Sequence, residues 1–470
     1  MSIRIFRHYV SLPLLLLMLA EAASHIGSVY LAAAVRVANI DHVYTYASGS
    51  ASIWLLPRAA LYAFVMLGVM TAFGLYGAQL RGNDREYKIR FLASFPAAGI
   101  AMVIIFYAIP ESFLGRGIMA LSLLFSLVGS LLARELFFRT VGEDALKRRV
   151  LVLGSGSRAV EVETLLERLG PSADFRLIGF LSCGDAPQAP PKSTLLGDCQ
   201  ALRALVREHR VDEIVVGVRD RRNGHLSMQE LLECKLEGVS IVDLPTFFER
   251  ETGLIQLMTL SKSWLVFSEG FYKSFRRRLL KQVFDISVSA VMLVATLPVM
   301  LLAALAILIE TGRPILYRQK RVGERGQVFE ILKFRSMRVD AEKDGVARWA
   351  RENDDRVTRV GKFLRLTRID ELPQLVNVLR GDMSFVGPRP ERPPFVTELT
   401  RNVPVYATRH SVKPGITGWA QICYPYGASM DDAVKKLQFD LYYVKNHSLF
   451  LDLVIIFQTA QVVLFGKGAR

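Results

Sequence analysis

Cysteine is scarce in this chain, with four residues among 470. Cys183, Cys199, Cys234 and Cys423 are scattered, and the sequence contains no Cys-x-x-Cys pair. This spacing argues against a zinc site and predicts buried thiols in a reducing compartment rather than disulfides. The sequence also lacks a zinc knuckle and an aromatic-rich RNA-binding motif, so its net charge of +15 indicates lipid headgroups or phosphorylated substrates and no nucleic acid.

Charged residues are absent from long parts of the chain. Half of the residues are hydrophobic (51%) and mean hydropathy is +0.27, although 22% of the residues are charged. The apolar residues must therefore be clustered, and segments of roughly 20 residues can cross the hydrocarbon core of a bilayer as helices. We predict four spans before residue 140, at 12–34, 53–78, 91–109 and 117–138.

The first span has some features of a signal peptide. Arg4 and Arg7 precede a Leu-rich run and resemble a signal peptide, but apolar character continues to about Val37, which favours an uncleaved helix. Basic loops alternate along the four spans and predict that both ends of the bundle are cytoplasmic. Glu21 and His25 lie one helical turn apart; we favour a satisfied pair between helices over a functional intramembrane charge.

Residues 149–260 form a predicted α/β module. Strands at 149–154, 175–181, 213–217 and 239–242 alternate with helical stretches, which is typical of a small parallel sheet. The turn from Gly154 to Ala159 is a loose dinucleotide fingerprint, with Ala in the third glycine position. Asp185 lies in a Pro- and Gly-rich loop and is a poor candidate for the ribose carboxylate. We therefore favour a structural or regulatory module, with nucleotide binding as the alternative.

A fifth apolar segment, 287–309, follows a linker at 261–280. The linker combines basic residues with aromatic ones, which suits a membrane interface; the aromatic residues are Trp264, Phe267, Phe271 and Tyr272. Pro298 lies near the middle of the apolar segment, where it interrupts helical hydrogen bonding. Basic residues flank both ends, so we predict a re-entrant helix that bends at Leu297-Pro298 and returns, against an ordinary kinked span.

Candidate catalytic residues follow this segment. Lys333 and Arg335 alternate along a predicted strand and should point to one face. Asp370 and Glu371 are adjacent carboxylates in a segment that also holds Arg365 and Arg368. An Asp-Glu pair at a helix start often serves only as an N-terminal cap. Beside arginines, however, an ionised carboxylate can attack phosphorus or hold Mg²⁺.

One further arginine stands in a rigid turn, Gly387-Pro388-Arg389-Pro390. Its guanidinium could bind phosphate with two hydrogen bonds, or the turn could be a plain structural corner.

The part of the chain from residue 281 resembles the monotopic polyprenol-phosphate phosphoglycosyltransferases, the bacterial sugar transferases that begin exopolysaccharide and O-antigen units. The matching stretches are KQVFDI (281–286), ILKFRSM (331–337), RIDELPQLVNVLRGDMSFVGPRP (368–390), VKPGITGWAQI (412–422) and FDLYYVKNHSLFLDLVIIFQT (439–459). The whole chain looks like the large branch of this family. The resemblance implies a membrane protein of mixed class: a transmembrane four-helix bundle (1–140), a Rossmann-like α/β module (149–260) and a C-terminal α/β-type monotopic catalytic domain (281–470) with a re-entrant helix and interfacial amphipathic helices.

The resemblance also implies roles. Asp370 would be the nucleophile and a ligand of Mg²⁺, and Glu371 would assist it. Phosphates would be bound by Arg365 and Arg389, with Lys333 and Arg335 lining the same pocket. A sugar 1-phosphate would pass from a UDP-sugar to undecaprenyl phosphate at the cytoplasmic side of the bacterial inner membrane, among its lipids. Small family members carry Ser-Pro at the helix bend, whereas this chain has Leu297-Pro298, so the serine hydrogen bond is absent.

Two other functions fit the sequence less well. A membrane-bound dehydratase or epimerase would need a complete glycine fingerprint and a Tyr-x-x-x-Lys pair in a second nucleotide-binding domain, and the sequence has neither after residue 275. A non-catalytic scaffold would not require an acidic pair among arginines. The apolar tail at 449–465 is read as an interfacial helix against a final span. The sugar, the polyprenyl length and the oligomeric state, a homo-oligomer included, stay open.

Overall fold

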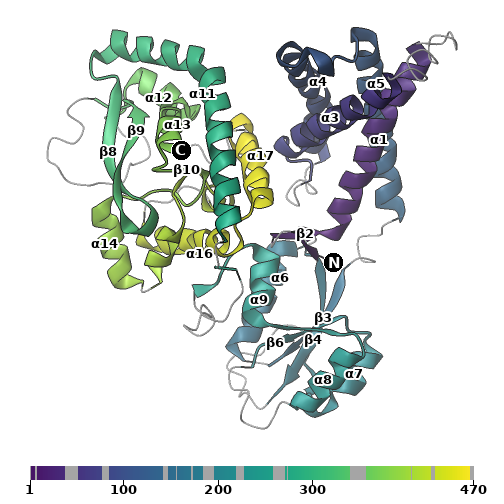
Figure 1. The fold of residues 1–470 in the computed structure, drawn as a ribbon. Coiled ribbons are helices and arrows are strands. Elements are labelled where there is room, and N and C mark those ends of the chain that lie inside the picture. The colour runs from purple at the N-terminus through teal and green to yellow at the C-terminus, as the bar shows by residue number, and fades with distance from the viewer. Residues whose placement is uncertain are drawn as a thin grey trace. The chain divides into compact units, whose positions relative to one another are not determined.

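The computed structural model forms two compact units, one comprising Tyr9–Thr252 with the first residues of the chain and the other Gly253–Arg470 (Figure 1). It describes the chain except residues 1, 6–7, 37–50, 77–83, 141–146, 155, 171–172, 184–194, 219–226, 258–269, 272–273, 339–355, 404, 425–428 and 466–470. The predictions that concern Asp185 and the linker aromatics Trp264, Phe267 and Tyr272 fall outside the described residues.

The first unit opens with a two-stranded sheet that the sequence did not predict, β1 (Ser2–Ile5) and β2 (His8–Ser11). Long helices then lie where the first four spans are predicted: α1 (Leu12–Arg36), α3 (Ala51–Ala72), α4 (Asp84–Ala108) and α5 (Arg116–Thr140), with a short turn η2 (Pro110–Ser112) before the last. Helix α1 packs along α3 and α5, and α4 contacts both α3 and α5. Their shared core buries large apolar side chains such as Tyr62, Met66 and Met102.

Two polar side chains of α1, Glu21 and His25, lie inside this core in different surroundings. Glu21 forms an ion pair with Arg134 of α5, with 2.6 Å between Oε1 and Nε, and both side chains are buried. Tyr76 donates a hydrogen bond of 2.5 Å to the other Glu21 oxygen. Glu21 is therefore a satisfied charge between helices, as predicted. His25 is not its partner: its ring lies edge-on to Tyr62, and its nitrogens have no hydrogen-bond partner among the described residues.

The same unit contains the predicted parallel sheet, in the strand order β5-β4-β3-β6-β7. Its elements are β3 (Arg148–Leu153), α6 (Ser157–Leu169), β4 (Phe175–Ser182), β5 (Leu195–Asp198), η4 (Cys199–Ala201), α7 (Leu202–Glu208), β6 (Glu213–Val216), α8 (Met228–Leu236), β7 (Ser240–Asp243) and α9 (Leu244–Thr252). Every paired strand is parallel. The sequence missed only the short edge strand β5, because its Leu-Leu-Gly-Asp sequence has no clear alternation.

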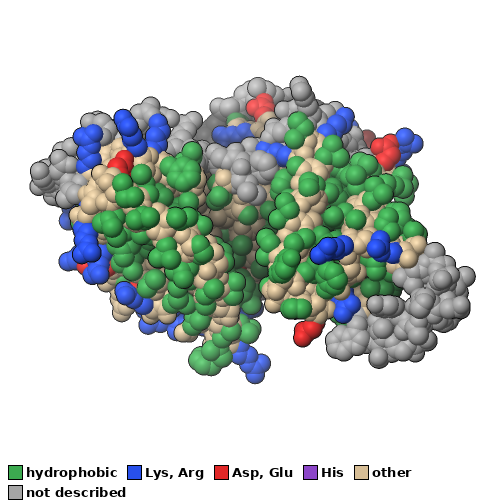
Figure 2. Space-filling model, turned by 90° about the horizontal axis from the view of Figure 1, so that it is seen from above, with side chains coloured by type: hydrophobic (Ala, Val, Ile, Leu, Met, Phe, Trp, Pro, Cys, Tyr) green, Lys and Arg blue, Asp and Glu red, His purple; other side chains and the backbone are tan. Residues whose placement is uncertain are grey.

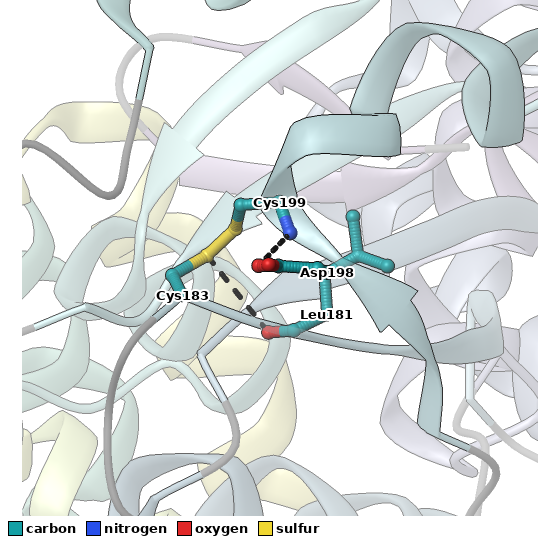
Figure 3. The surroundings of a disulfide bond; sticks show 4 residues. All are labelled: Leu181, Cys183, Asp198 and Cys199. Atoms are coloured by element: carbon teal, nitrogen blue, oxygen red, sulfur yellow. Dashed lines mark hydrogen bonds between the residues drawn. A yellow bond between two sulfur atoms is a disulfide. The ribbon is translucent and has the colours of Figure 1, made fainter.

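A disulfide joins Cys183 to Cys199 (Figure 3), so the prediction of free thiols is wrong for this pair. Strands β4 and β5 are parallel neighbours, and Ser182 lies in register with Asp198. Each cysteine is the first residue past its strand, so the two Cα atoms come within 5.2 Å, a spacing that a disulfide can bridge. Cys234 and Cys423 are free.

The fifth apolar helix, α11 (Phe275–Thr311), lies in the second unit and is 37 residues long. Ser274 caps its start by accepting a hydrogen bond from the backbone N–H of Arg277. Pro298 lies inside the helix, and Figure 1 shows a bent helix whose second part turns toward β8. Among the described residues, five helices are long and apolar enough to cross a membrane. They are all of α1 and α11, residues 55–72 of α3, residues 87–108 of α4 and residues 116–137 of α5.

The outer face of α11 is apolar. Valine and leucine side chains along both parts of the helix are exposed, including Val291, Val294, Leu301 and Leu302. Figure 2 shows hydrophobic side chains gathered on one face of this unit, with lysines and arginines at the margins. Such a face suits contact with a membrane.

The rest of the unit packs small sheets between helices. Its elements are β8 (Leu316–Val322), η6 (Glu324–Gly326), β9 (Val328–Phe334), α12 (Arg359–Leu366), η7 (Ile369–Glu371), α13 (Gln374–Arg380), β10 (Ser384–Val386), α14 (Pro393–Asn402), η8 (Tyr406–Ser411), β11 (Gly415–Thr417), α15 (Trp419–Cys423), α16 (Met430–Asn446) and α17 (Leu449–Phe465). Strands β8 and β9 are antiparallel, and β10 and β11 are parallel. Asp452, a polar interruption in apolar α17, is buried and forms an ion pair of 2.9 Å with Lys281 of α11.

Candidate active site

The acidic pair lies on η7, a single turn between two helices. Helix α12 ends at Leu366, and Arg368 then adopts a left-handed conformation with a φ of 59°. This conformation is uncommon for a residue with a side chain and marks a locally strained backbone. Ile369 packs against the apolar cluster that contains Phe334 and Leu364. The strained bend and this anchor together fix the direction in which Asp370 and Glu371 leave the backbone.

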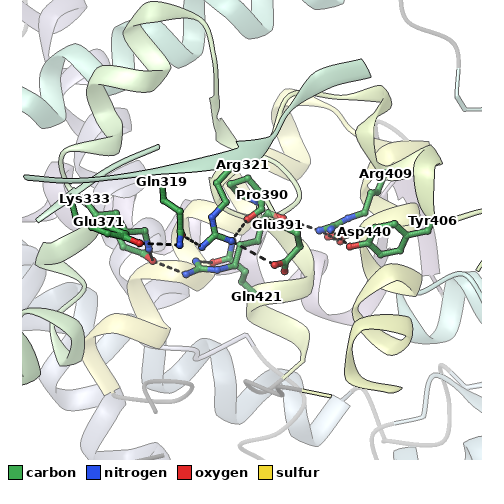
Figure 4. A network of polar contacts seen from close by, with 12 residues as sticks. Gln319, Arg321, Lys333, Glu371, Pro390, Glu391, Tyr406, Arg409, Gln421 and Asp440 are labelled. Atoms are coloured by element: carbon green, nitrogen blue, oxygen red, sulfur yellow. Dashed lines mark hydrogen bonds and ion pairs between the residues drawn. The ribbon is translucent and has the colours of Figure 1, made fainter. Parts of the chain in front are cut away.

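Glu371 is surrounded by cations. Its Oε1 accepts hydrogen bonds from Lys333 Nζ at 2.9 Å and Arg389 Nη2 at 2.8 Å, and its Oε2 lies 3.7 Å from Arg368 Nη1. Burial alone would raise the pKa of Glu371, but the charges of Arg389, Lys333 and Arg368 outweigh burial and hold that pKa well below its usual value. Figure 4 shows Lys333 and Glu371 at one end of a polar network. The ionised form of Glu371 is therefore favoured, and its carboxylate orders the surrounding cations.

Asp370 has a different environment, although it is the neighbouring residue. Only 7% of Asp370 is exposed, and among the described residues no hydrogen bond or ion pair engages its carboxylate. Burial, and the negative charge of Glu371, raise the pKa of Asp370 although the charge of Lys333 opposes them. Neither carboxylate caps a helix, since the residues that precede η7 and α13 are Arg368 and Pro373 without a side-chain cap. Asp370 is thus an uncommitted carboxylate, and the positive charges of Lys333, Arg365 and Arg389 act on it.

The turn that carries Arg389 follows β10. In the parallel pair β10–β11, Ser384 lies opposite Gly415 and Val386 opposite Thr417. The backbones beyond the strands touch so closely that a Cβ on Gly387 would lie 2.4 Å from the carbonyl oxygen of Lys413. Only glycine permits this approach. Arg389 is thereby presented to Glu371, and its Nη1 lies 3.4 Å from Gln421 Oε1.

The structure brings together most of the predicted site residues. Lys333 and Arg389 contact Glu371 directly, and the charge of Arg365 acts on Asp370. Arg335 does not join them. Because β9 ends at Phe334, the alternation stops before Arg335, and its guanidinium donates to the carbonyl oxygens of Thr311 and Gly312 at the end of α11, at 3.0 and 2.7 Å. A cation there is favoured by the partial negative charge of the helix C-terminus. Pro298 lies within α11 and is not part of this cluster.

Sequence reasoning missed several polar residues at the site. Gln421 reaches Arg389, while Arg321 and Gln319 of β8 extend the network toward Glu391 (Figure 4). In the sequence, Arg321 stands among the basic residues that follow the apolar segment 287–309. The signal that could have identified it is alternation: Tyr317, Gln319 and Arg321 share one face of β8, and Tyr317 lies opposite Lys333.

Comparison with known proteins gives this site a context. Residues 276–466 match the family model described as bacterial sugar transferase. A UDP-glucose:undecaprenyl-phosphate glucose-1-phosphate transferase of Xanthomonas campestris pv. campestris is 31% identical over 376 residues, which are 75% of this chain and 75% of that protein. This chain belongs to the bacterial sugar transferase family.

Two other members of the family are similar over a smaller part of their length. A UDP-N-acetylgalactosamine-undecaprenyl-phosphate N-acetylgalactosaminephosphotransferase of Aeromonas hydrophila is 40% identical over 56% of this chain. An undecaprenyl-phosphate glucose phosphotransferase of Komagataeibacter xylinus is 32% identical over 69% of this chain. The chain spans 61% and 60% of the length of these two relatives. All of the site residues described above lie inside the range that matches the family model.

Proposed function

We propose that this sugar transferase moves a sugar 1-phosphate from a UDP-sugar to undecaprenyl phosphate and releases UMP, as the first membrane step of exopolysaccharide or other surface glycan synthesis. The observation that carries the proposal is the contrast between Glu371, bound by cations, and the uncommitted Asp370 beside it. The names of three relatives support undecaprenyl phosphate as the acceptor. Those names include both glucose and N-acetylgalactosamine, so they do not decide the sugar.

The chemistry would proceed in two displacements. An oxygen of Asp370 attacks the phosphorus that bears the sugar, the bond from that phosphorus to the UMP oxygen breaks, and UMP leaves. A phosphate oxygen of undecaprenyl phosphate then attacks the same phosphorus, and the carboxylate of Asp370 leaves. Two separate steps avoid holding two anionic substrates together against their repulsion. Arg389, Lys333 and Arg365 would stabilise charge on the transferred phosphoryl group in each step.

The residues present fit a Mg²⁺ ion that is bound partly by substrate. Among the described residues, no group of three or more His, Cys, Asp or Glu side chains could hold a metal ion. Mg²⁺ in phosphoryl-transfer sites is commonly held by one or two carboxylates together with substrate phosphates, and Asp370 offers one. The ion would neutralise charge on the diphosphate.

The proposed membrane arrangement follows from α11. A straight helix of 37 residues would be about 55 Å long, well beyond the ~30 Å hydrocarbon core. The bend (Figure 1) and the basic residues that precede and follow the apolar segment 287–309 support a re-entrant helix with the catalytic unit on the cytoplasmic side of the inner membrane. Glu310, near its end, accepts a hydrogen bond of 2.9 Å from the backbone of Arg359 in α12. Since α12 also carries Arg365, the active site would lie close to the lipid surface.

Exchange of labelled UMP into the UDP-sugar, with Mg²⁺ present and lipid absent, tests this mechanism. We expect exchange with the wild-type chain and none with Asp370→Asn, because an amide cannot act as the nucleophile. Asp432→Asn is the matched control, since Asp432 lies outside the acidic pair, forms the capping box of α16 with Ser429 and accepts a hydrogen bond from Tyr424. Exchange that requires undecaprenyl phosphate would contradict the covalent mechanism and favour direct transfer, with Asp370 as a metal ligand. A scaffold without catalytic activity would give neither exchange nor transfer.

A further inference from the structure

The turn 387–391 is held by its carbonyl oxygens. Pro388 and Pro390 have no backbone N–H group, so these two residues cannot donate backbone hydrogen bonds that would hold the turn. Instead, four successive carbonyls each accept a hydrogen bond from a different donor: Pro388 from Gly415 N (3.0 Å), Arg389 from Arg409 Nη2 (2.9 Å), Pro390 from Arg321 Nη1 (3.0 Å) and Glu391 from Val322 N (2.9 Å). Two of the four donors are arginine side chains.

Arg409 is the more deeply buried of these two arginines, with 5% exposed. The Nη2 that binds the Arg389 carbonyl also lies 2.7 Å from Oδ2 of Asp440, and its Nη1 donates to the hydroxyl of Tyr406 at 2.6 Å. Asp440 and Tyr406 are buried as well. Figure 4 shows the three side chains together at the end of the network away from Lys333. Because so little of Arg409 is accessible and both terminal nitrogens are engaged, it is not placed to bind a substrate phosphate.

Arg321 donates to the next carbonyl, that of Pro390. Its Nη2 donates to Gln319 Oε1 at 2.6 Å, and its Nη1 lies 3.6 Å from Glu391 Oε2. Both arginines therefore join a carboxylate partner to the backbone of the turn. The side chain of Arg389 points the other way, toward Glu371.

We propose that Arg409, supported by Asp440, is a positioning residue that sets the direction of Arg389, with Arg321 completing the same clamp. The inference rests on the proposed function, because it assigns Arg389 to the transferred phosphate. Its physical basis is the planar guanidinium, whose Nη2 engages the Arg389 carbonyl and Asp440 while its Nη1 donates to Tyr406; the ammonium of lysine offers no such fork. Without Arg409, the Arg389 carbonyl and the Asp440 carboxylate would be left buried and unpaired.

A double-mutant cycle between Arg409 and Arg389 tests this. A displacement of about 1 Å in a site residue can lower the rate by about 100-fold. We therefore expect Arg409→Lys to lower kcat for UMP exchange by roughly 10- to 100-fold. In an Arg389→Ala background the same change should have an effect of no more than about 2-fold, because residues that act through one another are not additive. Equal effects in both backgrounds would mean a general structural role and would overturn the inference.

Two further variants protect the test against misfolding. Asp440→Asn keeps the side-chain shape but weakens the anchor of Arg409, and it should show the same dependence on Arg389. Arg250→Lys alters a partly buried arginine of the first unit that pairs with Glu213 and Glu251, and it should not change kcat. If the wild-type chain neither exchanges UMP nor binds UDP by calorimetry, the proposed function fails and the inference fails with it. An active wild type with an additive cycle refutes the inference alone.

Discussion

Arg389 donates a hydrogen bond of 2.8 Å to Glu371, the carboxylate that follows Asp370 in the chain. Lys333 donates to the same oxygen. The cations of the site therefore bind one member of the acidic pair and leave the other available. Two adjacent carboxylates thus have opposite pKa shifts, which is the arrangement expected when two acidic groups have different tasks.

The first prediction concerns pH. Burial and the charge of Glu371 raise the pKa of Asp370, and the nucleophile must be deprotonated. Exchange should therefore fall as the pH drops through a value above that of an ordinary aspartate. Lys333 is the strongest influence that lowers this pKa, so Lys333→Met should move the acid limb to higher pH, whereas Glu371→Gln should move it to lower pH. The measurement is kcat against pH at one Mg²⁺ concentration, and limbs that stay in place would refute the assignment.

A second prediction concerns the contact between the two strands that support Arg389. In Gly387→Ala the new Cβ would lie 2.4 Å from the Lys413 carbonyl oxygen, so the backbone must shift. We expect exchange to fall by about 100-fold while the chain remains folded. Gly27→Ala is the control, because a Cβ there meets no atom within 4 Å. Wild-type kinetics for Gly387→Ala would show that the close approach has no role in catalysis.

A third prediction concerns the ion pair of the helical bundle. Glu21→Gln leaves Arg134 buried without its anion, which should cost about 3–5 kcal/mol of stability. Glu21→Leu combined with Arg134→Met removes both charges and should be much less destabilising. Thermal unfolding in detergent measures both. A double variant that is as unstable as Glu21→Gln would indicate that the pair does more than satisfy two buried charges.

The fourth prediction concerns topology. If α11 re-enters, cysteines introduced at Phe275 and at Lys362 should both resist an impermeant thiol reagent applied to intact cells. Labelling at only one position would mean that α11 crosses the membrane. Replacement of Pro298 by leucine restores the missing backbone donor, so the helix should straighten and labelling at the two positions should begin to differ.

A fifth prediction concerns the boundary of the catalytic unit. Ile255 packs in the core formed by Trp419 and Tyr442, and Trp419 donates a hydrogen bond of 2.7 Å to the Gly253 carbonyl. A fragment that begins at Gly253 should therefore keep exchange activity, and one that begins at Ser274 should unfold at a lower temperature. Equal unfolding temperatures would show that the residues from Gly253 up to Ser274 do not stabilise the unit.

The sequence predicts the apolar helices, four of the strands in the parallel sheet and the acidic pair, because each of these depends on local pattern or on a run of neighbouring residues. It does not predict partners that are distant in the chain. His25 lies one helical turn from Glu21 in α1, yet the partner of Glu21 is Arg134, 113 residues away. Arg335 continues an apparent strand alternation, but β9 has already ended. Such outcomes depend on how segments pack against one another, which the local sequence does not record.

The crosslink between Cys183 and Cys199 has a consequence for assembly. Strand β5 lies at the edge of its sheet and has only four residues, so few hydrogen bonds attach it to β4. An edge strand that detaches exposes unpaired backbone groups on its neighbour, and these can recruit a strand from another chain. The disulfide ties the end of β5 to the end of β4, so the edge cannot peel away from that side. The disulfide therefore keeps the short strand β5 paired with β4, and a covered sheet edge is less prone to aggregate with another chain.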